Sequence, residues 1–337
     1  MLNFDPARFA AIQEGALALE DQIHGTIGRL VEAGAKNIFF LGAGGAGKLM
    51  QPAVQLLQRS TNFPVFLERP AEIIATDSAN LGPGSIVVIP SLSGTTKEAI
   101  AALEFSKAKG AIVITLTGHS QSFIALNADY NFTNFAEDDT SSESFYLQSL
   151  VLALSLLNHL GQYEEYGNTL AELSLLPRLL IEIKRNFEAD AARIADRIKD
   201  ETYHIITGAG PTWTQAWYYG TCILEEMQWI RTRPIHAADF FHGTLELLEK
   251  DVSVLVFKGE DASRPLVERL ETWASTISER VIVIDAAEFE LPGISSHTRS
   301  LISHVLIATV LERVSAHLEV LRGHPLTTRR YYKRAAY

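Results

Sequence analysis

The feature that most limits the fold is a strand, glycine turn and helix pattern that occurs twice along the chain. The apolar stretch Asn37–Leu41 runs into Gly42-Ala-Gly-Gly-Ala-Gly47 and then into residues at helical spacing. About half the chain later, His204–Thr207 runs into Gly208-Ala-Gly-Pro-Thr212 and a second helical pattern that reaches Glu226. A strand, a glycine turn and a helix begin a parallel α/β unit. The repetition predicts two such units in tandem.

Both copies continue with short apolar runs, as parallel strands buried on both faces do. The first copy has such runs at Val65–Glu68, Ser85–Pro90 and Ala111–Thr115, and a helix is expected over Glu98–Lys109. The second copy has them at Val252–Phe257 and Val281–Ile284, and a helix is expected over Pro265–Glu279. We therefore predict an α/β fold of two subdomains, each a parallel, doubly wound sheet flanked by helices.

The length of 337 residues suits two domains of roughly 150 residues each. We divide the chain into N-terminal helices (1–36), a first subdomain (37–163), linking helices (164–200), a second subdomain (201–322) and a C-terminal tail (323–337). The last helix is expected near Ser300–Leu321. The tail carries a basic cluster of Arg329, Arg330, Lys333 and Arg334. Such a cluster is either a solvated tail or a segment that folds back over an anionic ligand.

Composition narrows the class of protein. A formal charge of −11 argues against the broad basic face that nucleic acids require. No apolar run is long enough to cross a bilayer, and the N-terminus lacks the pattern of a signal peptide. The single cysteine, Cys222, excludes an internal disulfide and a multi-cysteine zinc site. We expect a cytoplasmic protein without metal, nucleic acid or membrane partners.

The first glycine loop fits three templates. Gly42-x-Gly44-x-x-Gly47 after a strand resembles a dinucleotide fingerprint, and Glu68 ends the next apolar run where a ribose-binding acid belongs. The same loop followed by Lys48 approaches a nucleotide-binding P-loop, but Leu49 replaces the hydroxyl that would hold magnesium. A tight turn that needs glycine only for close packing is the third possibility.

The loop after the next strand is more specific. Ser91-Leu-Ser-Gly-Thr-Thr-Lys-Glu98 has four hydroxyls within six residues, at the point where a helix begins. The first turn of a helix presents unpaired N–H groups and a positive dipole end, which together favour a phosphate. Capping the helix requires only one of these hydroxyls. We therefore interpret the loop as a phosphate cradle.

These motifs resemble a known family. The glycine loop together with Ser91–Glu98 resembles the sugar isomerase (SIS) fold, which binds phosphosugars. The segment Glu225–Gly243 is similar, without gaps, to the catalytic segment of the isomerase domain of glutamine–fructose-6-phosphate aminotransferase. The stand-alone proteins that the chain most resembles are the fructosamine 6-phosphate deglycases, which share a Phe-His-Gly sequence and a tail similar to Arg329–Tyr331. The resemblance covers nearly the whole chain.

The resemblance implies site residues. It implies Glu226 as the acid/base carboxylate and His242 as the histidine that opens the sugar ring, contributed by the neighbouring subunit of a homodimer. Substrate or phosphate contacts are implied for Gly44, Gly45, Ser91, Ser93, Thr96, Ser141 and the tail residue Lys333. Two residues depart from the family pattern: Ala46 replaces a phosphate-contacting serine, and Glu143 replaces a lysine.

The residues themselves leave alternatives. Glu225 and Glu226 are adjacent, so on a helix they point about 100° apart and cannot both reach one substrate atom. The resemblance favours Glu226, because the family motif places its carboxylate sixteen residues before the histidine. His236 is a second candidate for the functional imidazole. The aromatic residues Trp229, Phe240 and Phe241 are candidate anchors of a dimer interface.

The function implied is hydrolysis of a ketosamine 6-phosphate to glucose 6-phosphate and an amine, through proton transfer between C1 and C2 and without a cofactor. The alternative is a ketose/aldose or amino-sugar phosphate isomerase of the same fold. A nicotinamide-dependent oxidoreductase and a non-catalytic sugar-phosphate sensor are further alternatives. The amine half of the substrate is not indicated by any motif.

Overall fold

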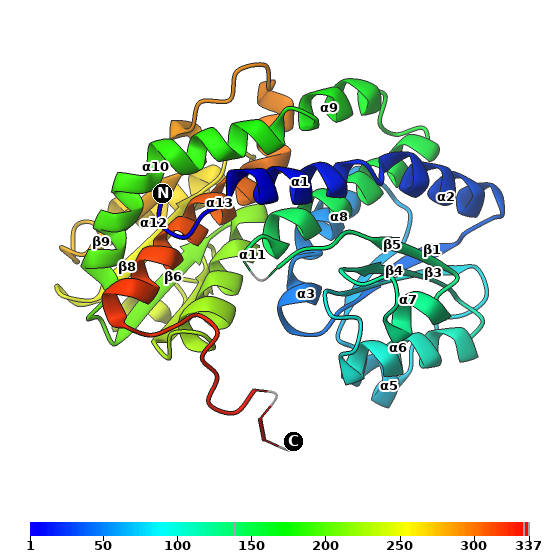
Figure 1. Ribbon diagram of the computed structural model, residues 1–337, viewed down its shortest axis with the longest axis horizontal. Coiled ribbons are helices and arrows are strands. Elements are labelled where there is room, and N and C mark those ends of the chain that lie inside the picture. The colour runs from blue at the N-terminus through cyan, green and yellow to red at the C-terminus, as the bar shows by residue number, and fades with distance from the viewer. Residues whose placement is uncertain (138, 333, 336–337) are drawn as a thin grey trace. The chain divides into compact units, whose positions relative to one another are not determined.

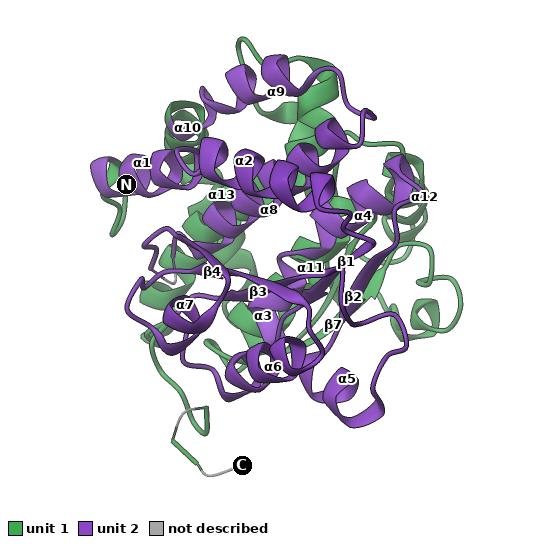
Figure 2. Cartoon of the chain, turned by 90° about the vertical axis from the view of Figure 1, so that its right-hand side faces the viewer, with its two compact units in different colours: residues 1–6, 178–337 green, residues 7–177 purple. Residues whose placement is uncertain are grey.

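The computed structural model describes residues 1–137, 139–332 and 334–335. The chain forms two compact units, which Figure 2 colours separately: unit 1 comprises residues 1–6 and 178–337, and unit 2 comprises residues 7–177. Each unit contains one parallel sheet flanked by helices, which confirms the predicted fold class. The boundary follows Pro177, within the segment 164–200, and the finer five-part division of the chain remains a prediction.

Unit 2 holds a five-stranded parallel sheet in the order β2-β1-β3-β4-β5. The strands are β1 (Asn37–Leu41), β2 (Val65–Glu68), β3 (Ser85–Ser91), β4 (Ile112–Thr117) and β5 (Tyr130–Thr133). The chain places β2 on one side of β1 and β3 on the other, so the strand order switches direction between β1 and β3. Ligands of open α/β sheets bind outside the carboxyl ends of the strands at such a switch point. The glycine loop and the hydroxyl loop both begin there.

Helices cover both faces of this sheet. They are α1 (Pro6–Leu17), α2 (Glu20–Glu32), α3 (Gly44–Lys48), α4 (Gln51–Ser60), α5 (Pro70–Thr76), α6 (Lys97–Ala108), α7 (Phe123–Asn127), α8 (Ser141–His159) and α9 (Tyr166–Leu173). Figure 2 shows α2 and α8 on one side of the sheet and α5 and α6 on the other. The helical pattern expected from Lys48 to Arg59 is confirmed over α4, whereas Leu49 and Met50 form a break between α3 and α4.

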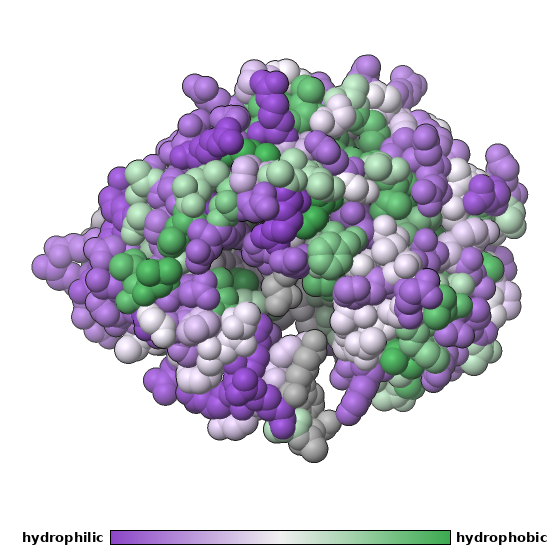
Figure 3. Space-filling view, in the orientation of Figure 1, coloured by the Kyte–Doolittle hydropathy of each residue, from purple (hydrophilic) through white to green (hydrophobic). Residues whose placement is uncertain are grey.

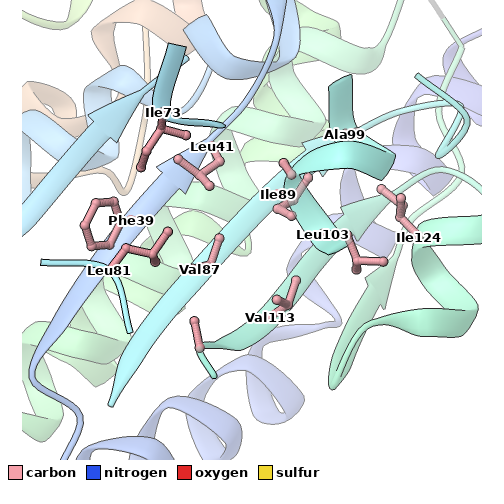
Figure 4. Close-up of a cluster of buried hydrophobic side chains, with 12 residues drawn as sticks. Phe39, Leu41, Ile73, Leu81, Val87, Ile89, Ala99, Leu103, Val113 and Ile124 are labelled. Carbon is pink, nitrogen blue, oxygen red and sulfur yellow. The ribbon is translucent and has the colours of Figure 1, made fainter. Parts of the chain in front are cut away.

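The core of unit 2 explains the apolar strands. Alternate residues of β1, β3 and β4 point toward the helices α5, α6 and α7 (Figure 4). Phe39 and Val87 are fully buried, as is Val113, and they pack with Ala102 and Ile124 from the helices. Each large apolar side chain buried in this way stabilises the fold by about 1.5–3 kcal/mol. The same packing holds the carboxyl ends of the strands in place.

Unit 1 holds a four-stranded parallel sheet in the order β7-β6-β8-β9. Its strands are β6 (Tyr203–Gly208), β7 (Arg231–His236), β8 (Ser253–Lys258) and β9 (Val281–Asp285). Its helical segments are α10 (Leu176–Ile198), α11 (Pro211–Tyr218), the π-helix η1 (Tyr219–Glu225), the 3-10 helices η2 (Thr244–Leu247) and η3 (Ala286–Glu288), α12 (Arg264–Ala274) and α13 (Ser296–Arg322). The expected helix Pro265–Glu279 is wrong at its end, because α12 stops at Ala274.

Helix α13 is the one described helix that is long and apolar enough to cross a membrane, but 83% of its apolar stretch is buried inside the molecule. The Ser295 side chain caps its first turn by accepting from the Thr298 N–H, and Gly323 ends it in the left-handed conformation. In Figure 1 the tail is the red segment that leaves the end of α13. Helix α13 is thus a core helix, and the tail follows directly after its last residue.

The visible surface is mostly hydrophilic. Figure 3 shows hydrophobic residues in small scattered groups among hydrophilic ones. The large apolar side chains with the greatest exposure include Leu126, Phe135, Val320 and Tyr331, which come from different elements. Single exposed apolar side chains of this kind are normal for folded proteins.

Candidate active site

The hydroxyl loop forms a compact network at the carboxyl end of β3. Ser91, the buried last residue of β3, has its Oγ 3.2 Å from Thr96 Oγ1 and accepts from the Gly94 N–H at 3.2 Å. Ser93 Oγ lies 3.1 Å from Thr95 Oγ1. Because all four hydroxyls come from one short loop, they gather at a single point of the sheet edge. The network holds neutral donors together without a charged side chain among them.

The same loop begins helix α6 without capping it. Thr96 is the N-cap residue of α6, yet no side chain makes a capping hydrogen bond there. The first N–H groups of a helix then remain available to an anion, and the helix dipole adds to the attraction. Helix capping therefore does not account for the hydroxyls of Thr96 and its neighbours. An uncapped helix start of this kind favours a bound anion.

Gly94 is essential to the shape of this loop. Its φ is +63°, a conformation that other residues rarely adopt, and a Cβ at this position would lie 2.0 Å from Ser122 Oγ. The Ser122 hydroxyl is buried and has no hydrogen-bond partner within the described part of the chain. The loop is therefore packed directly against the start of α7.

The glycine loop lies beside the hydroxyl loop. A Cβ at Gly42 would lie 2.3 Å from Gly47 Cα and 2.9 Å from the Pro90 ring, so close packing explains both glycines. Gly44 has a φ of +54° with open space around it, and Gly45 follows at the start of α3. Burial, together with the nearby Arg69 charge, lowers the pKa of Lys48 to about 8. The open side of the turn, at Gly44, is the part that a ligand can approach.

Three further positions of unit 2 are the predicted site residue Ser141 and the two residues that depart from the family pattern, Ala46 and Glu143. Ser141 is the buried first residue of α8, and the Glu143 side chain is also buried in that first turn. Ala46 lies within α3. A carboxylate at the positive end of α8 is electrostatically favourable. This attraction offsets part of the cost of burying the Glu143 carboxylate.

In unit 1, the glycine turn after β6 is filled by neighbouring side chains. Gly210 follows β6 with a φ of +54°, and a Cβ there would lie 2.7 Å from Asp261 Oδ1 and 2.5 Å from Ser263 Oγ. Asp261 Oδ1 also accepts from the Ser263 N–H at 2.8 Å. A carboxylate at this position repels a phosphate. The two copies of the pattern have therefore diverged, and within the part of the chain that the structure describes the hydroxyl cradle lies in unit 2.

The two adjacent glutamates of unit 1 have different partners. Glu225 Oε1 accepts from the N–H and the hydroxyl of Thr232, at 3.2 and 2.6 Å. Glu226 Oε1 accepts from Arg329 Nε at 2.9 Å, and the side chain of Glu226 remains 33% exposed. Glu225 is thus engaged with β7, whereas Glu226 meets the tail.

The backbone around Glu226 is unusual. The π-helix η1 ends at Glu225, and π-helical turns are frequent at functional sites. Three residues beyond Glu226, Trp229 has a φ of +56°, which reverses the chain into β7. Nearby, burial and the charges of the two glutamates raise the pKa of Cys222 to about 12, so the thiol is inert. These local features were not anticipated from the sequence, because π-helices leave no clear periodic signal.

The candidate histidines lie after β7. His242 is exposed. Its backbone N–H donates to the Asp239 carbonyl in a turn that precedes Gly243. His236, at the end of β7, packs edge-on against Trp213 with ring centroids 5.7 Å apart. His236 Nδ1 accepts from the Ala238 N–H at 3.1 Å. His242 is the more accessible imidazole of the two.

The proposed aromatic anchors of a dimer interface are wrong in part. Phe240 is fully buried in the core between the sheet and α12, and Phe241 packs edge-on against Trp273. The Trp229 ring is partly exposed but lies under the Arg330 guanidinium, 4.1 Å from its centroid. Phe240 and Phe241 therefore stabilise unit 1 itself.

The tail is docked on the segment that carries Glu226. Beyond the Arg329 contact, Gln228 Nε2 donates to the His324 carbonyl at 2.8 Å, and the Trp229 and His324 rings lie 4.5 Å apart. Lys333 lies outside the described residues. Sequence reasoning noted the basic tail but missed Arg329 as the partner of Glu226, because nothing in a run of basic residues indicates which distant carboxylate it meets.

The sequence that forms this site was compared with known protein families. Residues 33–158 match the model of the SIS domain. Residues 33–158 of this chain are therefore a SIS domain. The SIS domain includes β1 to β5, the glycine loop and the hydroxyl loop, so the predicted resemblance to this family is confirmed.

Relatives extend the likeness beyond the SIS domain. The chain is 29% identical to fructosamine deglycase FrlB of Bacillus subtilis over 89% of its own length and 92% of that protein. It is 26% identical to fructoselysine 6-phosphate deglycase of Escherichia coli, with 92% and 89% covered. A solved structure of a phosphosugar isomerase candidate from Bacillus subtilis matches 94% of the chain and all of that protein, with a TM-score of 0.86 and 27% identity.

Proposed function

We propose that the chain is a fructosamine 6-phosphate deglycase, which hydrolyses a ketosamine 6-phosphate to glucose 6-phosphate and a free amine or amino acid. The observation that supports this most is the nearly full-length likeness to two deglycases. The hydroxyl cradle in the SIS domain and the partly exposed Glu226 carboxylate agree with it. The chemistry requires neither a metal nor a nicotinamide.

The reaction needs one proton to move between two carbons. A ketosamine has nitrogen on C1 and a carbonyl, masked by the sugar ring, at C2. Removal of a proton from C1 forms an enaminol, and protonation at C2 then forms an imine that water hydrolyses. A single carboxylate above C1 and C2 can carry the proton, and we assign this role to Glu226. His242, which is exposed, is assigned to ring opening.

We assign the phosphate to the loop of neutral donors. The hydroxyls of Ser91, Ser93 and Thr96, the first N–H groups of α6 and the open turn at Gly44 and Gly45 are the proposed contacts. Ser141 is proposed to contact the sugar. Hydrogen bonds to charged groups contribute about 1.5–3 kcal/mol each. Several such donors bind a phosphate without a lysine or arginine in the loop.

We further propose that the protein acts as a cytoplasmic homodimer, with His242 contributed to the site of the neighbouring subunit. This rests on the family resemblance and on the exposure of His242. Because Phe240 is fully buried within unit 1, it is not among the residues proposed for the interface.

Product analysis tests the reaction. The protein is incubated with a panel of ketosamine 6-phosphates made from lysine, glutamine and asparagine, and glucose 6-phosphate and free amine are measured together. Equal amounts of both products are expected from at least one member. Conversion of fructose 6-phosphate to glucose 6-phosphate, without amine release from any ketosamine, would instead establish an isomerase.

A further inference from the structure

The contact between Arg329 and Glu226 joins residues 103 positions apart in the chain. Arg329 Nε donates to Glu226 Oε1 at 2.9 Å, and the Arg329 side chain is only 13% exposed. The Glu226 side chain remains 33% exposed, so water screens this ion pair in part, but less than it screens a pair of two fully exposed side chains. This contact therefore differs from the solvated surface pairs found elsewhere on the chain.

The tail holds Arg329 in place. Arg329 Nη1 donates to the carbonyls of Leu326 and Thr328, so the guanidinium is fixed by its own segment while its Nε faces Glu226. A turn closed by the Thr328 N–H to the Pro325 carbonyl shapes that segment. The Leu326 N–H donates to Glu319 Oε1 at 3.0 Å, which ties the turn to α13. The arginine is thus oriented before any substrate binds.

The surroundings of Glu226 disfavour its negative charge. The carboxylate follows the carboxyl end of α11 and η1, where helix dipoles place partial negative charge. Glu225 is its immediate neighbour, and the Cys222 thiol lies one turn earlier and stays neutral. Arg329 is a cation in direct contact with this carboxylate. An opposite charge beside a carboxyl group favours its ionised form.

We propose that Arg329 is a positioning residue, which keeps the Glu226 carboxylate ionised and oriented for proton transfer. The proposal rests on the proposed function, because Glu226 is the assigned base. It separates the tail arginines by role: Arg329 acts on the protein's own carboxylate, whereas Arg330 stacks on Trp229 and helps to dock the tail. The tail arginine nearest the site therefore serves the base and not the substrate.

The test compares Arg329→Met with Arg329→Lys and with the control Arg334→Met. Arg334→Met removes an exposed charge from the same tail without touching Glu226. An opposite charge at this distance lowers a carboxyl pKa by about 1–3 units. In Arg329→Met, the acidic limb of kcat should therefore move up by about one pH unit or more, so that kcat well below the wild-type midpoint is about tenfold lower while KM is little changed. Arg329→Lys should restore most of the shift, and Arg334→Met should match the wild type.

A second measurement does not depend on activity. The Glu226 carboxyl is titrated by NMR with ¹³C-labelled glutamate and assigned through Glu226→Gln, and its pKa should rise in Arg329→Met. Fluorescence of Trp229, taken as the difference from Trp229→Phe, verifies that the tail remains docked in the variant. If the tail undocks in Arg329→Met, the Arg329→Lys variant decides the question. With the tail docked in Arg329→Lys, a wild-type pKa of the Glu226 carboxyl supports the proposal, and a raised pKa contradicts it.

The outcomes separate the two proposals. A raised KM with an unmoved acidic limb would show that Arg329 binds substrate, and an unmoved limb with unmoved KM would show a dispensable surface pair. Either result overturns the positioning role. If the wild-type protein releases no amine from any ketosamine, the proposed function fails, and the NMR titration still decides whether Arg329 controls the ionisation of Glu226.

Discussion

At the residue scale, single oxygen atoms in the hydroxyl loop carry the proposed phosphate recognition. Removing one donor to a charged group costs about 1.5–3 kcal/mol, which corresponds to a tenfold or greater loss of affinity. We expect Ser93→Ala to weaken binding of a sugar 6-phosphate by at least that factor in isothermal titration. Ser60→Ala, which changes an exposed serine at the end of α4, should bind as the wild type does. Equal affinity in Ser93→Ala and the wild type would remove Ser93 from the site.

The adjacent glutamates allow a matched comparison. Glu226→Gln keeps the shape of the side chain but cannot take up a proton, so turnover should fall by about 10²–10⁴-fold while substrate still binds. Glu225→Gln should be mild, because an amide oxygen can still accept from Thr232. Steady-state kinetics on the preferred ketosamine measures both. Loss of activity in Glu225→Gln alone would shift the assignment by one residue.

At the element scale, the turn before α6 depends on glycine. Gly94→Ala combines a φ of +63° with a contact of 2.0 Å between the new Cβ and Ser122 Oγ, whereas Gly161→Ala has a φ of +69° with no atom within 4 Å. The left-handed conformation costs about 1–3 kcal/mol in both variants. Gly94→Ala should therefore lose more thermal stability than Gly161→Ala and should also lose phosphosugar binding. Equal melting temperatures would mean that the loop accommodates the methyl group.

The packing of α10 against α13 includes a buried charge network. Arg313, fully buried, donates to the Glu188 carboxylate, which also accepts from His317 and from the Leu2 N–H. Burial alone would raise the pKa of Glu188, but the hydrogen bonds and the Arg313 charge lower it to about 2.

This network predicts a pH dependence of stability. Because the folded pKa of Glu188 is depressed, its contribution is complete above about pH 4.5, the ordinary glutamate value, and is lost as the pH falls toward 2. Glu188→Gln should cost about 1–2 kcal/mol at pH 7, the difference between a charged and a neutral hydrogen bond. Urea unfolding at pH 7, 4 and 3 should show a smaller decline with acid in Glu188→Gln than in the wild type. Parallel declines would exclude this carboxylate as a source of the acid sensitivity.

At the scale of the whole molecule, the proposed dimer is tested by complementation. Subunits carrying Glu226→Gln are mixed with subunits carrying His242→Ala under conditions where exchange is verified by mass. Mixed dimers should recover part of the wild-type activity, because one site then receives both intact residues. No recovery despite exchange would mean that Glu226 and His242 act within one chain.

The sequence by itself determined the α/β class, the strand β1 to the residue, and the hydroxyl loop, because continuous apolar runs and glycine turns are encoded by neighbouring residues. It did not reveal that Asp261 closes the second glycine turn, that β7 is a strand, or that Phe240 is a core residue. Nor could it pair Glu226 with Arg329, more than a hundred residues away. Such contacts depend on how the chain folds back on itself, and no local pattern records which distant side chains will meet.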